Sequence, residues 1–283
     1  MTRIVILSDI HLSPTHGFFW ENFCVARDRT NELKPDAVIV TGDLCINGPD
    51  SDAEIEFAAS ALAGLKGPVL AIPGNHDIGD EPPGQDAKQL IDVDRLGRWD
   101  RSFGADRWRF VAGGWRLIGL NAQLFGSGLE REDEQRRWLE TELEAAAGHP
   151  VALFLHKPVF LEDVADPVAS ESCMVPAARA RFLELLKQRD VRLVVTGHLH
   201  QHRDRTIDGV RHLWAPSTAF TVPHDLGGDG RCAFLILDLA PDGATVSVER
   251  PRELISHDLM AIKQHGRYKF LRDMPHCPPK VAA

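Results

Sequence analysis

The pentapeptide Pro73-Gly74-Asn75-His76-Asp77 stands directly after the apolar run Val69-Leu70-Ala71-Ile72. A short run of aliphatic and β-branched residues that ends in Pro-Gly predicts a buried strand leading into a tight turn. Within three residues the turn then offers an amide oxygen, an imidazole and a carboxylate. A single Asn-His-Asp triplet is also found in ordinary polar loops, so its meaning depends on the rest of the chain.

The same arrangement, an apolar run followed by metal-type ligands, occurs four more times along the chain. The ligands are Asp9 and His11 after residues 4–7, Asp43 after 37–41, His156 after 151–155, and His198 and His200 after 191–196. Open α/β sheets place their ligands at the carboxyl ends of strands, so we expect these side chains to lie close together. Asp, Asn and His supply oxygen and nitrogen donors that suit Zn, Mn or Fe(II) rather than a thiolate-bound metal. Seven such groups exceed what one catalytic metal takes, so two divalent ions are expected.

The bulk composition is that of a globular protein rather than a nucleic-acid-binding or membrane-spanning one. The 283 residues carry a net charge of −9, with 43% apolar and 26% charged residues. This acidic balance argues against long nucleic acid as a partner. No run approaches the roughly 18 apolar residues of a membrane span, and strand-like sequence almost directly after Met1 leaves no room for a secretory signal. The five cysteines are scattered and form no C-x-x-C pair, so we expect neither a disulfide framework nor a zinc knuckle, and a cytoplasmic location.

The chain alternates between strand-like and helix-like segments and then becomes mostly β. Helical patterns are expected at 20–33, 51–65, 87–100, 130–147 and 176–189, and a hairpin at 107–111 and 115–120. After residue 200, short alternating runs separated by Asp208-Gly209 and Pro241-Asp242-Gly243 predict further hairpins. This order favours an α/β protein (an α+β-like sandwich) in which helices flank two sheets. We expect residues 1–250 to form the catalytic domain and 251–283 a C-terminal extension that lies on the surface or makes an oligomer contact.

The ordered set Asp9-x-His11, Gly42-Asp43, Gly74-Asn75-His76-Asp77, His156 and Gly197-His198-x-His200 resembles the five blocks of the calcineurin-like metallophosphoesterases. Within that family it is most similar to the bacterial class III cyclic-nucleotide phosphodiesterases and the related glycerophosphodiesterases. Gln135-x-x-Trp138-Leu139-Glu140 and Ala215-Pro216-Ser217-Thr218 also look like that subgroup. The resemblance covers roughly residues 3 to 240, and it implies a four-layer αββα fold with two mixed β-sheets flanked by helices.

Position by position, the resemblance implies two metal sites and a catalytic pair. Asp9, His11 and His200 would hold one metal, Asn75, His156 and His198 the other, and Asp43 would bridge them. His76 would be no metal ligand but would stand beside the substrate, and Asp77 would orient it. The implied reaction is in-line attack on a small phosphodiester by a hydroxide shared between the metals, with a cyclic nucleotide such as cAMP favoured.

Two alternatives stay open within the enzymes, and one outside them. A glycerophosphodiesterase, or a broad phosphomonoesterase or pyrophosphohydrolase, would use the same metal centre. A non-catalytic binding module on the same scaffold would lack metal ligands, and here all seven are present.

For several further residues the less specific interpretation is favoured. We expect His16 to be a surface loop residue and His202 to lie outside the ligand set. We expect Phe18-Phe19-Trp20 to pack the first helix rather than to form a base-stacking site. The sequence does not decide whether His224 lines the pocket. It also does not decide whether Arg203 and Arg205 contact a phosphate or form a solvated strand edge.

Overall fold

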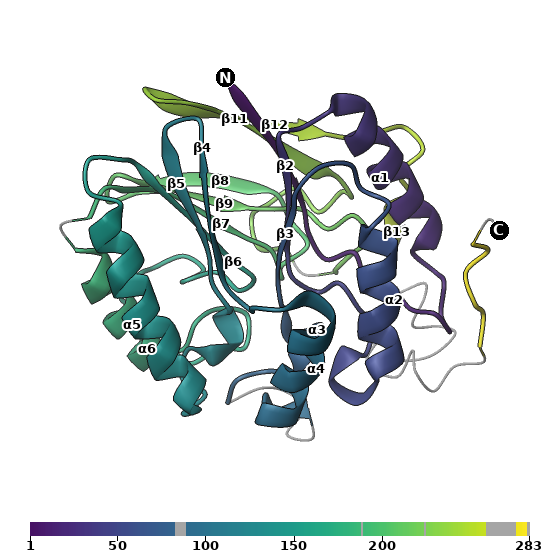
Figure 1. Cartoon of the computed structure of the whole chain (residues 1–283), viewed down its shortest axis with the longest axis horizontal. Coiled ribbons are helices and arrows are strands. Elements are labelled where there is room, and N and C mark those ends of the chain that lie inside the picture. The colour runs from purple at the N-terminus through teal and green to yellow at the C-terminus, as the bar shows by residue number, and fades with distance from the viewer. Residues whose placement is uncertain (83–88, 188, 224, 259–275, 282–283) are drawn as a thin grey trace.

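Two mixed β-sheets pack face to face, and helices cover the outer face of each (Figure 1). The computed structural model describes residues 1–82, 89–187, 189–223, 225–258 and 276–281. His224, a candidate pocket residue, therefore lies outside the described residues. The observed layers are the αββα arrangement that the resemblance implied.

The first sheet has five strands in the order β12-β11-β1-β2-β3. Strand β1 is central, parallel to β2 and antiparallel to β11. The strands are β1 (Thr2–Leu7), β2 (Ala37–Thr41), β3 (Val69–Ile72), β11 (Phe234–Ala240) and β12 (Gly243–Glu249).

The second sheet has six strands in the order β4-β5-β6-β7-β9-β8. Its strands are β4 (Trp108–Ala112), β5 (Trp115–Gly119), β6 (Val151–Leu155), β7 (Val191–Thr196), β8 (Arg203–Ile207) and β9 (Val210–Trp214). The predicted hairpin at 107–120 is confirmed as the antiparallel pair β4–β5. A separate two-stranded pair joins β10 (Phe220–Thr221) to β13 (His257–Asp258).

The alternation of side chains along β1 shows how the layers are made. Val5 and Leu7 point to the core between the first sheet and its covering helices, whereas Ile4 and Ile6 point to the core between the two sheets. A strand buried on both faces reads as a continuous apolar run, which is why this one could be predicted from the sequence. The helices over the first sheet are α1 (Trp20–Leu33), α2 (Asp52–Leu62) and α4 (Val93–Phe103). Those over the second sheet are α5 (Glu130–Ala145) and α6 (Pro176–Leu186).

Short helical turns lie in the connections near the ligand-bearing strand ends. They are η1 (Gly48–Asp50), α3 (Asn75–Ile78) and η3 (Ala122–Leu124). The turn expected after Pro73-Gly74 is thus wound into the single helical turn of α3. No helix among the described residues is long and apolar enough to cross a membrane.

One predicted helix is misplaced. The pattern at 87–100 predicted a helix from residue 87, but α4 begins at Val93, and residues 83–88 lie outside the described part of the chain. The backbone around Leu90 is extended instead, because the N–H groups of Asp80 and Ile91 bond to the carbonyls of Gln89 and Asp80. Asp92 then caps the helix, with its side chain accepting a hydrogen bond from the N–H of Arg95.

Candidate metal centre

The carboxyl ends of β1, β2, β3, β6 and β7 carry the seven candidate ligands of the sequence to one edge of the two sheets. Parallel strands in each sheet direct these ends the same way, and the face-to-face packing of the sheets brings them together. Among the described residues three overlapping groups of possible ligands form: a first group, Asp9–His11–His200, a second group, Asp43–His156–His198, and a third, His11–Asp43–His76. Within each group the ligand atoms lie within 4.8 Å of one another.

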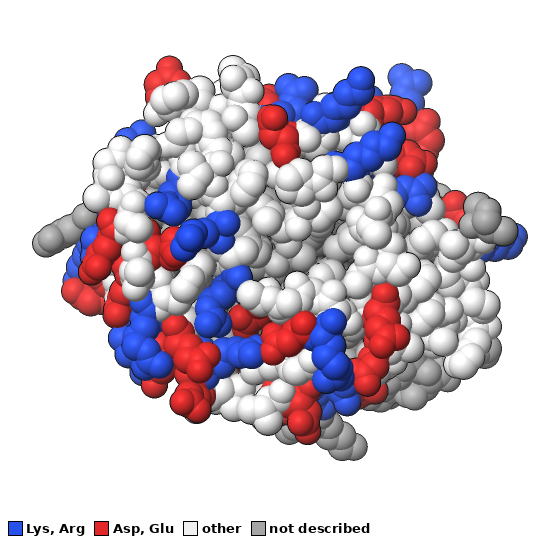
Figure 2. Space-filling model, viewed as in Figure 1, with Lys and Arg blue, Asp and Glu red and all other residues white. Residues whose placement is uncertain are grey.

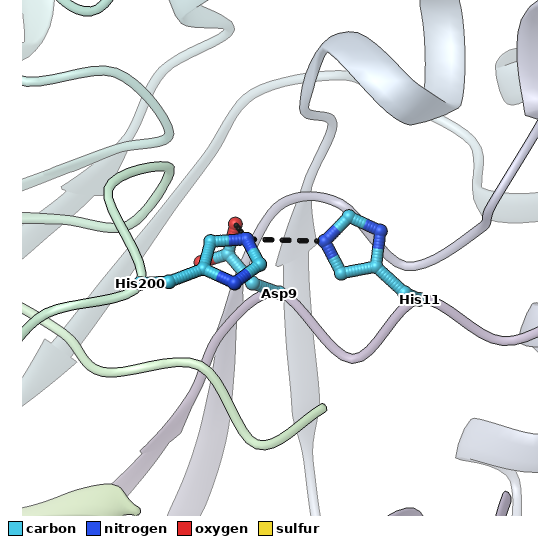
Figure 3. Close-up of side chains that lie close together, drawn as sticks. All are labelled: Asp9, His11 and His200. Atoms are coloured by element: carbon cyan, nitrogen blue, oxygen red, sulfur yellow. Dashed lines mark hydrogen bonds and ion pairs between the residues drawn. The ribbon is translucent and has the colours of Figure 1, made fainter. Parts of the chain in front are cut away.

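The first group is fully buried and its donor atoms face one another (Figure 3). The two Nε2 atoms of His11 and His200 are 3.3 Å apart. The Nε2 atom of His200 also lies 3.3 Å from Oδ1 of Asp9. Asp9 is held by its neighbours, because its carboxylate accepts hydrogen bonds from the hydroxyl of Ser8 and the backbone N–H of His198.

The second group is built around His156. Its Nε2 atom lies 3.1 Å from Oδ1 of Asn75 and 3.2 Å from Nδ1 of His198. Asn75 comes from the first residue of α3, and the histidines come from the ends of β6 and β7. The three residues that were assigned to the second metal are therefore brought together.

Asp43 belongs to the second group and also lies close to the first. Its Oδ1 atom is 3.3 Å from Nε2 of His156, and its Oδ2 atom is 3.8 Å from Nε2 of His11. One carboxylate thus presents an oxygen to each group. This is the placement expected of a ligand shared between two metal ions.

Backbone carbonyls fix the outer nitrogen of several histidines. The partners are Thr41 for Nδ1 of His156, Phe220 for Nδ1 of His200 and Glu171 for Nε2 of His198, at 2.8 to 3.1 Å. When such an imidazole is neutral it donates from one nitrogen only, so its inward nitrogen then carries a lone pair that a metal ion can bind. Lone pairs that face one another at these distances repel, and a cation between them removes the repulsion. The donor set therefore fits divalent metal ions.

Burial and the two carboxylates set the protonation of the ligands. Burial lowers the pKa of His11 and of His198 well below its usual value, so both rings are neutral near pH 7. For His156 burial acts in the same direction, but the charges of Asp43 and Asp9 outweigh it and raise the pKa to about 9. Burial raises the pKa of Asp43, yet His156 and the other nearby histidines hold it well below its usual value.

The backbone at the centre is strained. Among the described residues, seven non-glycine residues have positive φ angles, and five of them are candidate ligands: Asp9, His11, Asp43, His198 and His200, with φ between 45° and 70°. This region of backbone conformation is costly for L-residues and persists only where the surroundings hold it. Its concentration at these residues is independent support for a functional site.

His76 lies at the edge of the first group. Its ring centroid is 4.9 Å from that of His11, and its Nδ1 atom is 2.9 Å from the carbonyl oxygen of Ile46. Its backbone N–H donates to Oδ1 of Asp43. One ring nitrogen of His76 also lies within 4.8 Å of ligand atoms of His11 and Asp43, so the ring faces the centre.

Asp77, which was expected to orient His76, bonds to the backbone of two neighbouring loops. The fully buried side chain accepts hydrogen bonds from the backbone N–H groups of Leu44, Cys45 and Gly74, at 2.8 to 2.9 Å. Leu44 and Cys45 lie between Asp43 and Ile46, so the carboxylate ties the loop of Asp43 to the loop of Asn75. Its connection to His76 runs through the backbone of Ile46.

A buried ionic cluster that no sequence pattern predicted lies beside the second group. Lys157 follows His156, is only 1% exposed, and its Nζ atom lies 2.5 Å from Asp80 and 2.9 Å from Glu81. Burial, opposed by Lys157 but aided by Asp80, raises the pKa of Glu81 to about 8. The only signal in the sequence was the position of these charges directly after two of the ligand motifs.

The other candidates mostly have structural roles. Phe19 and Trp20 are buried core residues, as the packing interpretation predicted. His16 is buried rather than exposed, which corrects the surface interpretation. Arg203 and Arg205 both pair with Glu162, so they form a strand-edge ion cluster. His202 bonds through Nδ1 to the carbonyl of Trp214 and belongs to neither ligand group.

Comparison with known proteins adds the family. The chain is 27% identical to the 3′,5′-cyclic adenosine monophosphate phosphodiesterase CpdA of Escherichia coli, covering 87% of this chain and 85% of that protein. It is 29% identical to the glycerophosphodiester phosphodiesterase GpdQ of Enterobacter lignolyticus, covering 68% and 65%. A dimetal phosphatase structure from Danio rerio has the same fold, with a TM-score of 0.62 at 16% identity over 88% of this chain and 96% of that one. The family model for calcineurin-like phosphoesterases matches residues 2–202. With that match spanning the ligand motifs, the chain belongs to the calcineurin-like phosphoesterase family.

Proposed function

We propose that this protein hydrolyses small phosphodiesters with two divalent metal ions, and that a 3′,5′-cyclic nucleotide such as cAMP is the favoured substrate. One ion would be held by Asp9, His11 and His200, the other by Asn75, His156 and His198. The observation that carries the proposal is Asp43, which presents one oxygen to each group at 3.8 and 3.3 Å. Imidazole, carboxylate and amide donors favour Fe, Mn or Zn as the ions.

The chemistry of a phosphodiester explains why such a centre is needed. The anionic oxygens repel a hydroxide nucleophile, and two divalent cations would neutralise that charge and lower the pKa of a bound water. Hydrolysis then yields a monoester and an alcohol without a covalent bond to the protein.

His76 is the proposed catalytic side chain. The carbonyl of Ile46 holds its Nδ1–H, so Nε2 is the atom that faces the centre. When protonated, Nε2–H can donate to a phosphoryl oxygen or to the departing alkoxide, where negative charge develops. Asp77 supports this geometry by bonding to the backbone N–H groups of Leu44 and Cys45, directly after Asp43, and of Gly74.

The substrate class rests on the relatives and on the charge of the chain. CpdA is named for cyclic AMP, and its alignment covers most of this chain and of CpdA. GpdQ, which is named for glycerophosphodiesters, supports the alternative. On the face shown in Figure 2, Lys and Arg side chains are interspersed with Asp and Glu. A chain of net charge −9 with this mixed surface suits a small substrate better than a long nucleic acid.

The first test compares bis(p-nitrophenyl) phosphate with p-nitrophenyl phosphate as substrates, with Mn²⁺ supplied, in the wild type and in Asn75→Ala. We expect a strong preference for the diester and a loss of at least a hundredfold in the variant, because a direct ligand is removed. A panel of cAMP and glycerophosphodiesters then separates the two substrate classes.

Two results would overturn the proposal. Preference for the monoester would make the protein a phosphatase. Metal analysis that finds clearly less than one ion per chain, after purification without chelator and with metal supplied, would contradict a metal-dependent hydrolase.

A further inference from the structure

The loop 217–221 forms the inner support of the first ligand group. The hydroxyl of Ser217 donates to the backbone carbonyl of Asp9 at 2.8 Å, and the N–H of Thr218 donates to the carbonyl of Ser8 at 3.1 Å. The carbonyl of Phe220 holds Nδ1 of His200 at 2.9 Å. This loop therefore contacts the surroundings of two ligands, Asp9 and His200, directly.

Residues 255–258 lie against the outside of that loop. The buried amide of Asn22 in α1 donates to the carbonyls of Thr218 and Ile255, at 2.9 and 2.7 Å, and accepts from the N–H of Ile255 at 3.0 Å. Strand β13 pairs with β10, and the hydroxyl of Thr221 donates to the carbonyl of His257 at 3.1 Å. The C-terminal residues thus fix both ends of the supporting loop.

Residues 276–281 lie against the loop that follows His11, on the α1 and α2 side of the molecule (Figure 1). The N–H of Cys277 donates to the carbonyl of Thr15 at 2.7 Å, and the N–H of Gly17 donates to the carbonyl of Cys277 at 2.9 Å. The approach is so close that a Cβ atom on Gly17 would lie 2.6 Å from the backbone of Pro279. This contact begins four residues beyond His11.

The two segments thus contact the two loops that lie next to the first ligand group, residues 217–221 and 15–17. Asp9, His11 and His200 all have positive φ angles, and such a backbone persists only when its surroundings over-determine it. In the second group Asp43 and His198 also have positive φ angles, whereas His156 and the neighbouring Asn75 do not. The contacts described above all lead to the first group.

We infer that residues 255–258 and 276–281, here called the C-terminal brace, position Asp9, His11 and His200 and thereby raise the metal affinity of that group. The brace lies beyond residues 2–202, the part matched by the family model. It gives the expected C-terminal extension a function within its own chain. The inference rests on the metal-binding part of the proposed function and on no particular substrate.

The test uses two pairs of matched variants in the full-length protein. Gly17→Ala displaces residues 276–281, whereas Gly243→Ala adds the same methyl group where no atom lies within 4 Å. Thr221→Val removes the hydroxyl that bonds to His257, whereas Thr221→Ser keeps it. Zn²⁺ affinity is measured by competition with a chromophoric chelator and fitted to two ions, and amide exchange is followed at Cys277.

We expect Gly17→Ala to speed amide exchange at Cys277. Gly17→Ala and Thr221→Val should each weaken one of the two ions about tenfold, as outer contacts of metal ligands do, and leave the other unchanged. Both controls should match the wild type. Equal weakening of both ions would indicate general loosening, and would overturn the inference. So would wild-type affinity in the two test variants, or unchanged exchange at Cys277.

The readout separates this inference from the proposed function. If the wild type hydrolyses no phosphodiester but the variants still weaken one ion, the substrate proposal fails and the brace stands. If the wild type is an active diesterase and the variants bind both ions normally, the brace fails alone.

Discussion

Replacing Asp77 with Asn tests whether this residue holds the loops of the centre or acts on His76. The carboxylate is 0% exposed, and its Oδ1 atom accepts from the N–H groups of Leu44 and Cys45 while Oδ2 accepts from Gly74. An Asn side chain can keep the first two bonds, but its NH₂ group then faces the N–H of Gly74.

The cost can be worked from that change. Burial and the charge of Asp43 raise the pKa of Asp77 to about 7, so the carboxylate prevails above that pH. A bond to a charged acceptor contributes about 1.5–3 kcal/mol, and the Gly74 N–H is left buried without an acceptor, so at about pH 8 Asp77→Asn should lower the free energy of unfolding by about 3 kcal/mol. Because the same bonds position Asp43 and the carbonyl that holds His76, kcat/KM should also fall, by about 10- to 100-fold.

Urea unfolding monitored by Trp fluorescence, in metal-saturated protein, measures the first effect, and diester hydrolysis measures the second. Asp28→Asn is the control, since that side chain is 64% exposed on α1 and should leave both quantities unchanged. A fall in kcat/KM with a change in stability below about 0.5 kcal/mol would refute the reasoning. It would restore the first expectation, in which Asp77 orients His76 directly.

Three further changes probe other parts of the centre. In Gly197→Ala the new Cβ would lie 2.1 Å from Oγ of Ser8 and 2.7 Å from Oδ2 of Asp9. Bound metal, measured by mass spectrometry, should therefore fall below two ions per chain. The control Gly230→Ala should retain both ions, because the nearest atom to its new Cβ is 3.9 Å away. Lys157→Met should lower the free energy of unfolding by about 3–5 kcal/mol because Asp80 and Glu81 remain buried without their cation. Adding Asp80→Asn and Glu81→Gln should recover most of the lost free energy of unfolding. No recovery would show that the lysine acts through packing alone. Burial, with Arg205 nearby, lowers the pKa of His212 to about 4, so the unfolded chain binds a proton that the folded chain does not. The stability that depends on this group is present above pH 6.5 and is lost as the pH falls toward 4, so the melting temperature of His212→Phe should drop less than that of the wild type between pH 7.5 and pH 5.

The alternation of strands and helices and the candidate ligands at the strand ends could be predicted from the sequence, because both depend on local patterns. A strand covered on both faces is a continuous apolar run, and a ligand at a strand end follows it directly, as Asp9 follows β1 and His156 follows β6. The start of α4 was misplaced because the pairing of Asp80 with residues 89 and 91 overrides the helical pattern before Asp92.

What could not be predicted are the contacts between distant segments. Asp77 bonds to an N–H group 33 residues away, Lys157 pairs with a carboxylate 76 residues away, and Cys277 pairs with residues near the other end of the chain. No periodicity encodes such pairs, because each depends on how two loops of the finished fold meet. The backbone contacts of Asp77 therefore could not be predicted from its motif.

The positive φ angles explain why these distant contacts gather at the metal centre. A glycine would adopt such a backbone without strain, as Gly42 does beside Asp43, but a ligand position needs its side chain. Asp9, His11, Asp43, His198 and His200 must therefore be held in place by their surroundings. The bonds of Asp77 to the loop after Asp43, and of Ser217 to Asp9, provide that support. The polar contacts around the centre are thus a physical consequence of placing ligands on left-handed turns at strand ends, and weakening them should loosen the metal ions before it unfolds the sheets.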